Sequence, residues 1–238
     1  MQQNHVKSAL ILGVCLLLGL TALGYLLGTS ALKFKAYERT VTVKGLSERE
    51  YPADIVIWPI SFVEAGNDLT ELYLVTERHT QTLIAFLEAN GIERQELTVS
   101  APGISDKLAQ GYEKARIEFR YMATQTVTVY SSKIDTVRAA MNKMGDLGKQ
   151  GIAIADNTYE HATEYLFTRL NEVKPSMIEQ ATTQAREVAE KFAKDSKSRL
   201  GKIKRASQGQ FSIGDRDRNN PHIKKVRVVS TIEYYLSD

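Results

Sequence analysis

Three polar residues near the carboxyl terminus have the spacing of the first ligands of a calcium loop. Asp215, Asp217 and Asn219 correspond to positions 1, 3 and 5 of the EF-hand loop, whose oxygen atoms bind Ca²⁺. Asn220 stands at position 6, where that loop needs glycine, and Val226 replaces the glutamate that closes it. Without that carboxylate, the segment predicts a hairpin turn with solvated charges instead of a calcium site.

Histidine is the commonest zinc ligand and general base, but the four histidines do not have the spacing of a zinc site or of a catalytic motif. They lack the i, i+4 pairing and the H-E-x-x-H pattern that place two imidazoles on one helix face. We therefore predict that they are surface or packed side chains. They are His5, His79, His161 and His222.

Other candidate sites also favour structural readings. Glu48, Glu50 and Asp54 lie around Pro52 and fit either a polar interaction site or a solvated turn, of which the turn is favoured. Trp58 and Tyr73 belong to apolar periodic segments and are predicted to lie in the core. Gly145, Gly148 and Gly151 follow an expected helix end, whereas phosphate-binding glycines precede a helix start.

The sequence contains no nucleophile-elbow, Walker or dinucleotide-binding motif. The single cysteine, Cys15, excludes an intramolecular disulfide and a cysteine-based metal site, and Val14 before it argues against lipidation. We predict a protein that is not an enzyme, with no catalytic, cofactor-binding or metal-binding residues.

Charge is nearly balanced beyond the first 30 residues, with 30 Lys and Arg against 28 Asp and Glu. A nucleic-acid-binding protein needs clustered excess positive charge, so no nucleic acid partner is expected.

The amino-terminal region contains 20 consecutive uncharged residues, 9–28. A helix of that length spans roughly the 30 Å hydrocarbon core of a bilayer. The stretch is longer than the usual signal-peptide core, of about 7 to 15 residues, and no clear cleavage site follows it. We therefore predict an uncleaved single-pass anchor at 9–28, after a short tail at 1–8 and before a linker at 29–39. Gly24 and Gly28 form a G-x-x-x-G pattern, which fits either close helix contact or simply the high glycine content of membrane helices.

The charges beside this segment predict an orientation. Lys7 and the amino terminus lie on one side, against Lys33, Lys35 and Arg39 on the other. By the positive-inside rule alone, the large domain would lie in the cytoplasm.

Residues 40–130 alternate between strand and helix patterns. Thr40 to Lys44 reads as a strand that ends at Gly45. Residues 54–63 are apolar on both faces, as in a strand that is buried on both sides, and Pro59 marks a bulge or a sheet edge within it. A helix capped by Asn67 continues to Gly91. Two further strands are expected at 97–104 and 116–130, separated by a polar loop.

The later part repeats this mixture. Ser132 and Asp135 form a capping box for a helix, and a short strand follows at 152–155. A strand is expected within 159–168, and Pro175 opens a helix with an alanine-rich stripe that allows close approach to a neighbouring surface. Strands at 201–213 and 223–236 form a final hairpin. The fold class is α+β, with antiparallel hairpins and packed helices after the amino-terminal transmembrane helix.

The segment G-L-S-E-R-E-Y-P-A-D-I at 45–55, the helical alanines of 181–193 and L-G-K-I from Leu200 resemble the SIMPL-domain family of exported bacterial proteins. F-T-R-L-N-E-V-K-P-S-M-I at 167–178 and K-K-V-R-V-V-S-T at 224–231 are similar to a membrane-anchored branch of that family. The likeness covers 40–238, which we expect to be one SIMPL-like domain, divided into two lobes or undivided. It departs from commoner members at M-G-D-L-G-K-Q-G, 144–151.

This resemblance implies an α+β fold, location in the cell envelope and, in some members, assembly into ring-like homo-oligomers. It implies no established chemistry. Weighing it above the charge rule, we expect the large domain in the periplasm, held at the inner membrane by residues 9–28. The leading hypothesis is a structural or stress-related protein that assembles into a homo-oligomeric ring or cage. The alternative is an envelope binding module for a small molecule or peptide, and other protein partners are not predicted.

Overall fold

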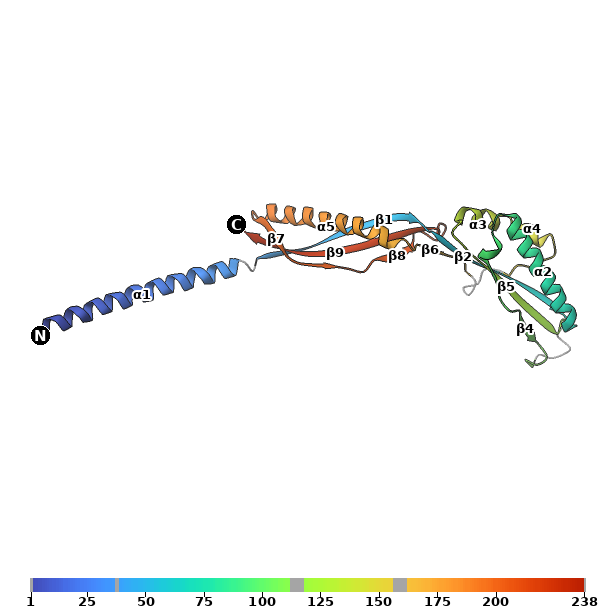
Figure 1. Ribbon diagram of the computed structural model, residues 1–238, viewed down its shortest axis with the longest axis horizontal. Coiled ribbons are helices and arrows are strands. Elements are labelled where there is room, and N and C mark those ends of the chain that lie inside the picture. The colour runs from blue at the N-terminus through green and yellow to red at the C-terminus, as the bar shows by residue number, and fades with distance from the viewer. Residues whose placement is uncertain (1, 37–38, 112–117, 156–161, 238) are drawn as a thin grey trace. The chain divides into compact units, whose positions relative to one another are not determined.

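The computed structural model describes residues 2–36, 39–111, 118–155 and 162–237, with the backbone alone at 2–11 and 31–36. The elements in chain order (Figure 1) are α1 Gln2–Ala36, β1 Thr40–Pro52, β2 Ile55–Gly66, α2 Leu69–Ala89, η1 Arg94–Glu96, β3 Leu97–Val99, β4 Gly103–Asp106, β5 Tyr121–Ser131, α3 Ile134–Met141, α4 Gly145–Gly148, β6 Glu164–Leu166, α5 Leu170–Asp195, β7 Arg199–Gln208, β8 Ser212–Asp215 and β9 Ile223–Ser237. This mixture of helices and antiparallel strands confirms the predicted α+β class.

The chain divides into two compact units. Unit 1 comprises residues 1–48, 174–211 and 227–238, and unit 2 comprises 49–173 and 212–226. Each unit therefore combines segments that are far apart in the sequence.

Helix α1 contains an apolar stretch, Leu12–Ser30, with a mean hydropathy of 1.9 and no part buried inside the protein. The hydroxyl groups of Thr21 and Thr29 donate to the carbonyl oxygens of Leu17 and Tyr25 one turn earlier, so neither hydroxyl needs water as a partner. An apolar helix of this length at the amino terminus fits a membrane anchor or a signal sequence.

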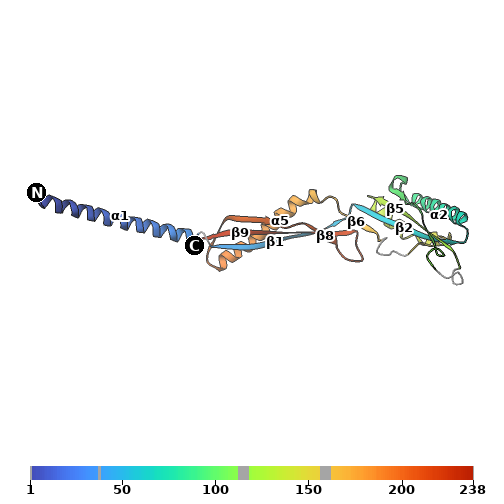
Figure 2. The same ribbon diagram turned by 90° about the horizontal axis from the view of Figure 1, so that it is seen from below.

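In unit 1, helix α5 covers one face of a sheet in which β9 lies between β1 and β7, as two perpendicular views show (Figures 1 and 2). Val43, Ile232 and Tyr234 of the sheet pack against Ala185 and Ala189 of the helix. The predicted close approach of the alanine stripe therefore takes place within unit 1.

Strand β1 comes closest to α5 at Gly45. A Cβ atom added there would lie 1.8 Å from the carbonyl oxygen of Ala181 and 2.6 Å from the backbone nitrogen of Ala185. The prediction that the first strand ends at Gly45 is wrong, because this glycine lies inside a strand that continues to Pro52. It permits helix-to-strand contact and does not form a turn.

Helix α5 begins at Leu170, so the prediction that Pro175 opens it is also wrong. Both carboxylate oxygens of Asp54 accept the backbone N–H of Thr168, at 2.9 and 3.0 Å. One of them also accepts from the guanidinium of Arg169, at 3.3 Å. Because the helix start is stabilised by a residue more than a hundred positions earlier, no local sequence signal marks it.

Unit 2 contains a sheet in the order β3, β5, β2, β6, with β4 also paired to β5. Strands β2 and β5 pair antiparallel without interruption from Val56↔Ser131 to Gly66↔Tyr121. Pro59 therefore causes no bulge. It lies beyond the last residue of β2 that pairs with β6, so it marks a local sheet edge as predicted.

Helices α2, α3 and α4 lie on one face of the unit 2 sheet (Figure 1). The core between these layers includes Val56, Trp58, Ile60 and Phe62 of β2. These side chains alternate along the strand, and its other face is only partly buried. The prediction that β2 is covered on both faces is therefore wrong.

Two predicted helix caps are wrong. Asp68, and not Asn67, caps α2 by accepting the backbone N–H of Glu71 at 2.9 Å. Asn67 instead accepts from Arg120 N, which ties the start of α2 to the start of β5. Helix α3 has no side-chain cap, and Ser131 in place of Ser132 accepts the backbone N–H of Lys133.

Several strand boundaries also differ from the predictions. The strand expected at 97–104 is divided into β3 and β4. That expected at 152–155 is a single bridge between Ile154 and Phe62. The strand expected within 159–168 is β6, and residues 112–117 and 156–161 lie outside the described part of the chain. The final hairpin is confirmed, since β7 pairs antiparallel with β9 from Arg199↔Ser237 to Gln208↔Ser230.

We predict that Gly45→Ala destabilises unit 1 by about 3 kcal/mol, because the added methyl group overlaps backbone atoms that move only if α5 moves. Hydrogen exchange of the α5 amides measures this loss within the unit. The matched control is Gly214→Ala in β8, where no atom lies within 4 Å of the added Cβ. Equal protection of α5 in the two variants would contradict the close contact.

Candidate interaction surface

The residues with calcium-loop spacing form a turn between β8 and β9. Asp217 accepts the backbone N–H groups of Asn219 and Asn220, each at 2.9 Å, and the guanidinium of Arg216 at 2.9 Å. Asp215 forms an ion pair with Lys224. These carboxylates therefore have partners within the hairpin, which is the turn that the sequence predicts.

The acidic residues around Pro52 do not form the predicted solvated turn. Glu48 and Glu50 lie on strand β1, where they face Arg227 at 4.0 Å and Arg216 at 3.7 Å respectively. Asp54 is largely shielded from solvent and supports the start of α5. All three carboxylates have structural partners.

The histidines that the structure describes are packed side chains. His79 Nδ1 lies 2.6 Å from Glu64 Oε1, and the ring of His222 meets the edge of Tyr165 with centroids 6.1 Å apart. The side chains of His5 and His161 lie outside the described residues. No group of three His, Cys, Asp or Glu side chains within the described residues could hold a metal ion.

One hollow in unit 2 brings Ser132, Asp135 and His222 together, the residue types of a hydrolytic triad. No hydrogen bond joins the side chains of these three described residues, and burial lowers the pKa of His222 below its usual value. The base-to-nucleophile contact on which such catalysis depends is therefore not formed here.

A small ionic cluster fixes the edge of the unit 2 sheet. Glu96 accepts the hydroxyl of Ser131 at 2.6 Å and the backbone N–H of Glu93 at 2.8 Å, and Lys133 forms an ion pair with Glu93. Burial opposes ionisation of Glu96, but these hydrogen bonds and the charge of Lys133 leave its pKa lowered. The cluster joins η1, β5 and the start of α3, so the adjoining strand β3 is held against β5.

Beside β3 lies an open groove of about 500 Å³ between α2 and the sheet edge. We call it the α2 groove. Its apolar side chains include Tyr73, Leu74 and Val99, which are 46%, 57% and 38% exposed. The prediction that Tyr73 lies in the core is wrong, whereas Trp58 is buried as predicted.

Three polar side chains of the α2 groove have hydrogen-bond partners within the protein. Thr76 and Thr80 donate to carbonyl oxygens of their own helix, each at 2.8 Å, and Gln125 donates to the carbonyl oxygen of Ser100 at 2.8 Å. The groove therefore offers apolar area from Tyr73, Leu74 and Val99 beside polar side chains that are already bonded, which suits an apolar protein surface. Sequence periodicity missed it because Tyr73 and Leu74 continue the apolar pattern of α2 beyond the width of the sheet that this helix covers.

The comparisons with known proteins concern most of the chain that follows α1. The family model described as SIMPL, protein of unknown function (DUF541), matches residues 41–230. The chain belongs to the SIMPL family. A comparison with curated proteins finds no match. The matched residues include all of unit 2 and part of unit 1, so the α2 groove and strand β7 of the unit 1 sheet lie within the SIMPL match.

We predict that Asp217 titrates near pH 2. Its pKa is about 2 instead of 3.8, chiefly because of the hydrogen bond from Arg216. The resulting contribution to folding is complete above pH 3.8 and is lost as the pH falls toward 2, since the folded state holds this carboxylate ionised. Carboxyl carbon NMR of the full-length protein measures the titration.

Arg216→Gln should move the Asp217 pKa upward toward 3.8. Arg218→Gln removes the same charge from the same turn, where no hydrogen bond joins that residue to Asp217 among the described side chains, and should leave the titration in place. A wild-type midpoint near 3.8 would contradict the role assigned to Arg216.

Proposed function

We propose that this SIMPL protein is a non-enzymatic assembly protein, anchored in the inner membrane by α1, with its domain in the periplasm. Copies of the domain associate into a homo-oligomeric ring or cage with a structural or stress-related role. The α2 groove carries the proposal, because it exposes Tyr73, Leu74 and Val99 together beside a sheet edge. Exposed apolar side chains gathered in one place are typical of interaction surfaces.

A second copy is the occupant that we favour. Anchoring by α1 confines copies to one membrane surface and raises their effective concentration, so a small apolar contact is enough for association. The neighbouring strand β3 lies at the edge of its sheet, where a further strand can add.

The alanine stripe of α5 does not support assembly. Met177, Ala181, Ala185, Ala189 and Ala193 are all buried within unit 1, so the stripe is already occupied by the sheet. The contact between copies is therefore assigned to unit 2.

The alternative is a binding module in which a small molecule or a peptide occupies the α2 groove. Its volume of about 500 Å³ is within the range of ligand sites. Thermal stabilisation of the protein by an envelope metabolite or an apolar peptide, without a change in particle size, would favour this module.

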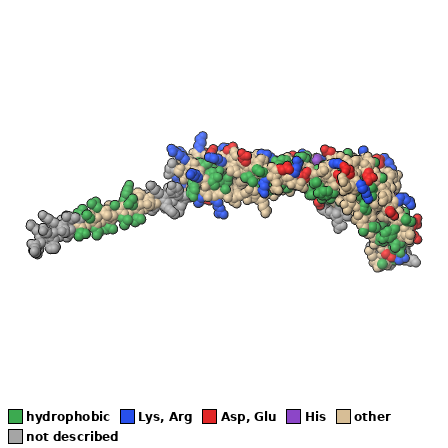
Figure 3. Space-filling model, viewed as in Figure 1, with side chains coloured by type: hydrophobic (Ala, Val, Ile, Leu, Met, Phe, Trp, Pro, Cys, Tyr) green, Lys and Arg blue, Asp and Glu red, His purple; other side chains and the backbone are tan. Residues whose placement is uncertain are grey.

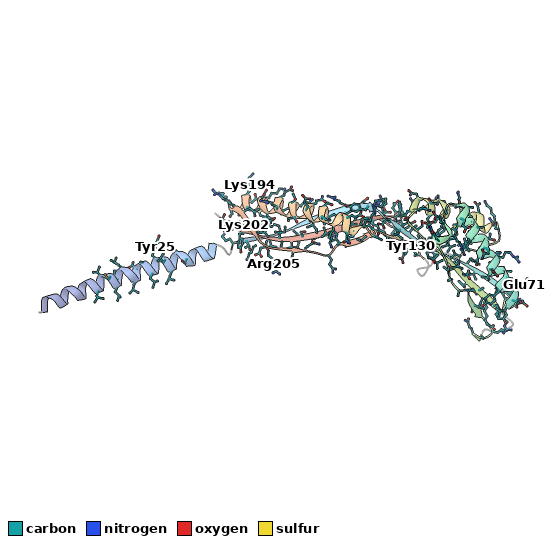
Figure 4. The ribbon with its side chains drawn as sticks, viewed as in Figure 1. Tyr25, Glu71, Tyr130, Lys194, Lys202 and Arg205 are labelled. Atoms are coloured by element: carbon teal, nitrogen blue, oxygen red, sulfur yellow. The ribbon has the colours of Figure 1, made fainter. Side chains whose placement is uncertain are left out.

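We predict that the full-length protein in mild detergent forms closed oligomers and that Tyr73→Ser reduces them to smaller particles, by at least about tenfold in association constant. Electron microscopy and light scattering at micromolar concentration measure this. The matched control is Tyr130→Ser, since Tyr130 is 54% exposed on β5 of the same unit and does not line the groove. Tyr130 is labelled in Figure 4.

The same measurement on a chain beginning at Ala31 separates the contributions of anchor and domain. Oligomers in both chains place the contacts in the domain, and oligomers in the full-length protein alone make α1 part of the assembly. Monomers in both would overturn the assembly proposal and favour the binding module.

We predict that the domain lies outside the cytoplasm, against the charge rule. In a Cys15→Ser background, Gln150→Cys should react with a membrane-impermeant maleimide in intact cells, because Gln150 is exposed on unit 2. Gln3→Cys, at the opposite end of α1, should react only after lysis. The reverse pattern would place the domain in the cytoplasm.

A further inference from the structure

Positive charge is concentrated where the carboxyl-terminal end of α5 leads into β7. Residues 191–205 contain seven Lys or Arg and one acidic residue, Asp195. Together with 33–39, these segments hold ten basic and two acidic residues, which leaves 21 basic against 26 acidic in the rest of the chain. The balanced total therefore conceals a strongly basic region within an otherwise acidic protein.

Five of these residues form what we call the basic patch: Lys191, Lys194, Lys197, Arg199 and Lys202. All five are exposed, and none pairs with an acidic side chain among the described residues. Lys204, by contrast, pairs with Glu233 at 3.1 Å and is left out of the patch. Figure 3 shows Lys and Arg side chains gathered over this end of unit 1, where Figure 4 labels Lys194 and Lys202.

The patch lies beside the point at which the chain leaves α1. Arg39 Nη2 donates to Ser198 Oγ at 3.1 Å, and the backbone oxygen of Arg39 accepts the N–H of Leu236 at 2.8 Å. Ser198 stands between Lys197 and Arg199, so Arg39 is fixed against the middle of the patch.

The covalent chain limits how far the patch can be from α1. Helix α1 ends at Ala36, three residues before Arg39, and three extended residues reach at most about 11 Å. The apolar stretch ends at Ser30, only six residues earlier, or about 9 Å along the helix. Arg39 therefore lies within about 20 Å of the end of the apolar stretch, whatever direction α1 takes.

We propose that the basic patch binds the anionic headgroups of phospholipids in the membrane that α1 spans. This inference rests on the proposed anchoring. Clusters of four to eight Lys or Arg next to a membrane helix attract anionic lipid, and the attraction extends over about a Debye length, near 8 to 10 Å. Long, flexible side chains and tilting of α1 bring the patch within that distance.

A lipid surface fits the patch better than a soluble polyanion does. Phe192 is 55% exposed between Lys191 and Lys194, on the last turns of α5. An apolar ring surrounded by lysines is typical of segments that lie at the boundary between headgroups and acyl chains. Binding there would hold the end of unit 1 that contains the basic patch at the membrane surface.

The test uses the full-length protein in nanodiscs of phosphatidylcholine, with or without about 40% phosphatidylglycerol, and measures lysine acetylation site by site. We expect acetylation of Lys194, Lys197 and Lys202 to be at least about threefold slower in the anionic discs and to recover in about 0.5 M NaCl. Lys149, which is exposed on unit 2, should react equally in both discs. Equal rates for the patch in the two discs would overturn the proposal.

Variants separate the patch from overall charge. In Lys194→Gln/Lys197→Gln/Lys202→Gln, the remaining Lys191 should lose its protection by anionic lipid. The control Arg78→Gln/Arg94→Gln/Lys149→Gln removes three exposed charges from unit 2 and should keep the protection of the patch. Loss of protection in both variants would overturn the assignment to this surface.

Further measurements use soluble anions in place of anionic lipid. In phosphatidylcholine discs, inorganic phosphate at about 10 mM should give no protection, since the expected attraction comes from many headgroups together. If a short oligonucleotide protected the patch and phosphatidylglycerol did not, the proposed lipid ligand would be wrong and a soluble polyanion would be favoured. Failure of the protein to co-elute with any nanodisc would overturn the anchoring itself, whereas co-elution without protection by anionic lipid would overturn the patch proposal alone.

Discussion

The approach of α5 to β1 is the constraint on which unit 1 depends. At Gly45 the backbones of helix and strand touch, with no room for even one methyl group. Such contact requires alanine on the helix and glycine on the strand, and the buried alanines at 181, 185, 189 and 193 satisfy it. Larger side chains, Val43, Ile232 and Tyr234, fill the space on either side of the contact. The unit is thus stabilised by a narrow, close-packed interface between segments more than a hundred residues apart.

This contact also explains which surfaces are left for other functions. Because α5 uses its alanine stripe internally, that stripe is not available to a partner, and the charged side chains of the basic patch remain exposed on unit 1. In unit 2, α2 buries Leu72, Leu83, Ile84 and Leu87 but leaves Tyr73 and Leu74 on the surface. An apolar contact surface and a basic one therefore belong to separate units, which suits a domain that binds its neighbours with one and the membrane with the other.

The fold class and most elements could be predicted from hydrophobic periodicity, whereas the family was recognised from the resemblance of segments such as 45–55 and 167–178. Two of the errors arose where a distant residue determines the local structure. Gly45 resembles the end of a strand, yet it lies inside β1 because α5 packs there. Pro175 resembles the start of a helix, yet α5 begins earlier because Asp54 stabilises its start. The α2 groove was not predictable from the sequence. Periodicity identifies the apolar positions of a helix, but it does not show how many of them the sheet is wide enough to bury.

The charge distribution shows the same dependence on folding. The positive-inside rule counts basic residues within about 15 to 20 positions of a membrane helix, so Lys33, Lys35 and Arg39 count and residues 191–205 do not. The latter reach the end of α1 only after β9 has paired with β7 and Arg39 has met Ser198. A basic surface that forms in this way cannot influence how α1 inserts, because long segments translocate largely regardless of charge. It can nonetheless bind lipid once the domain has folded, so export of the domain and a basic face at the membrane are physically compatible.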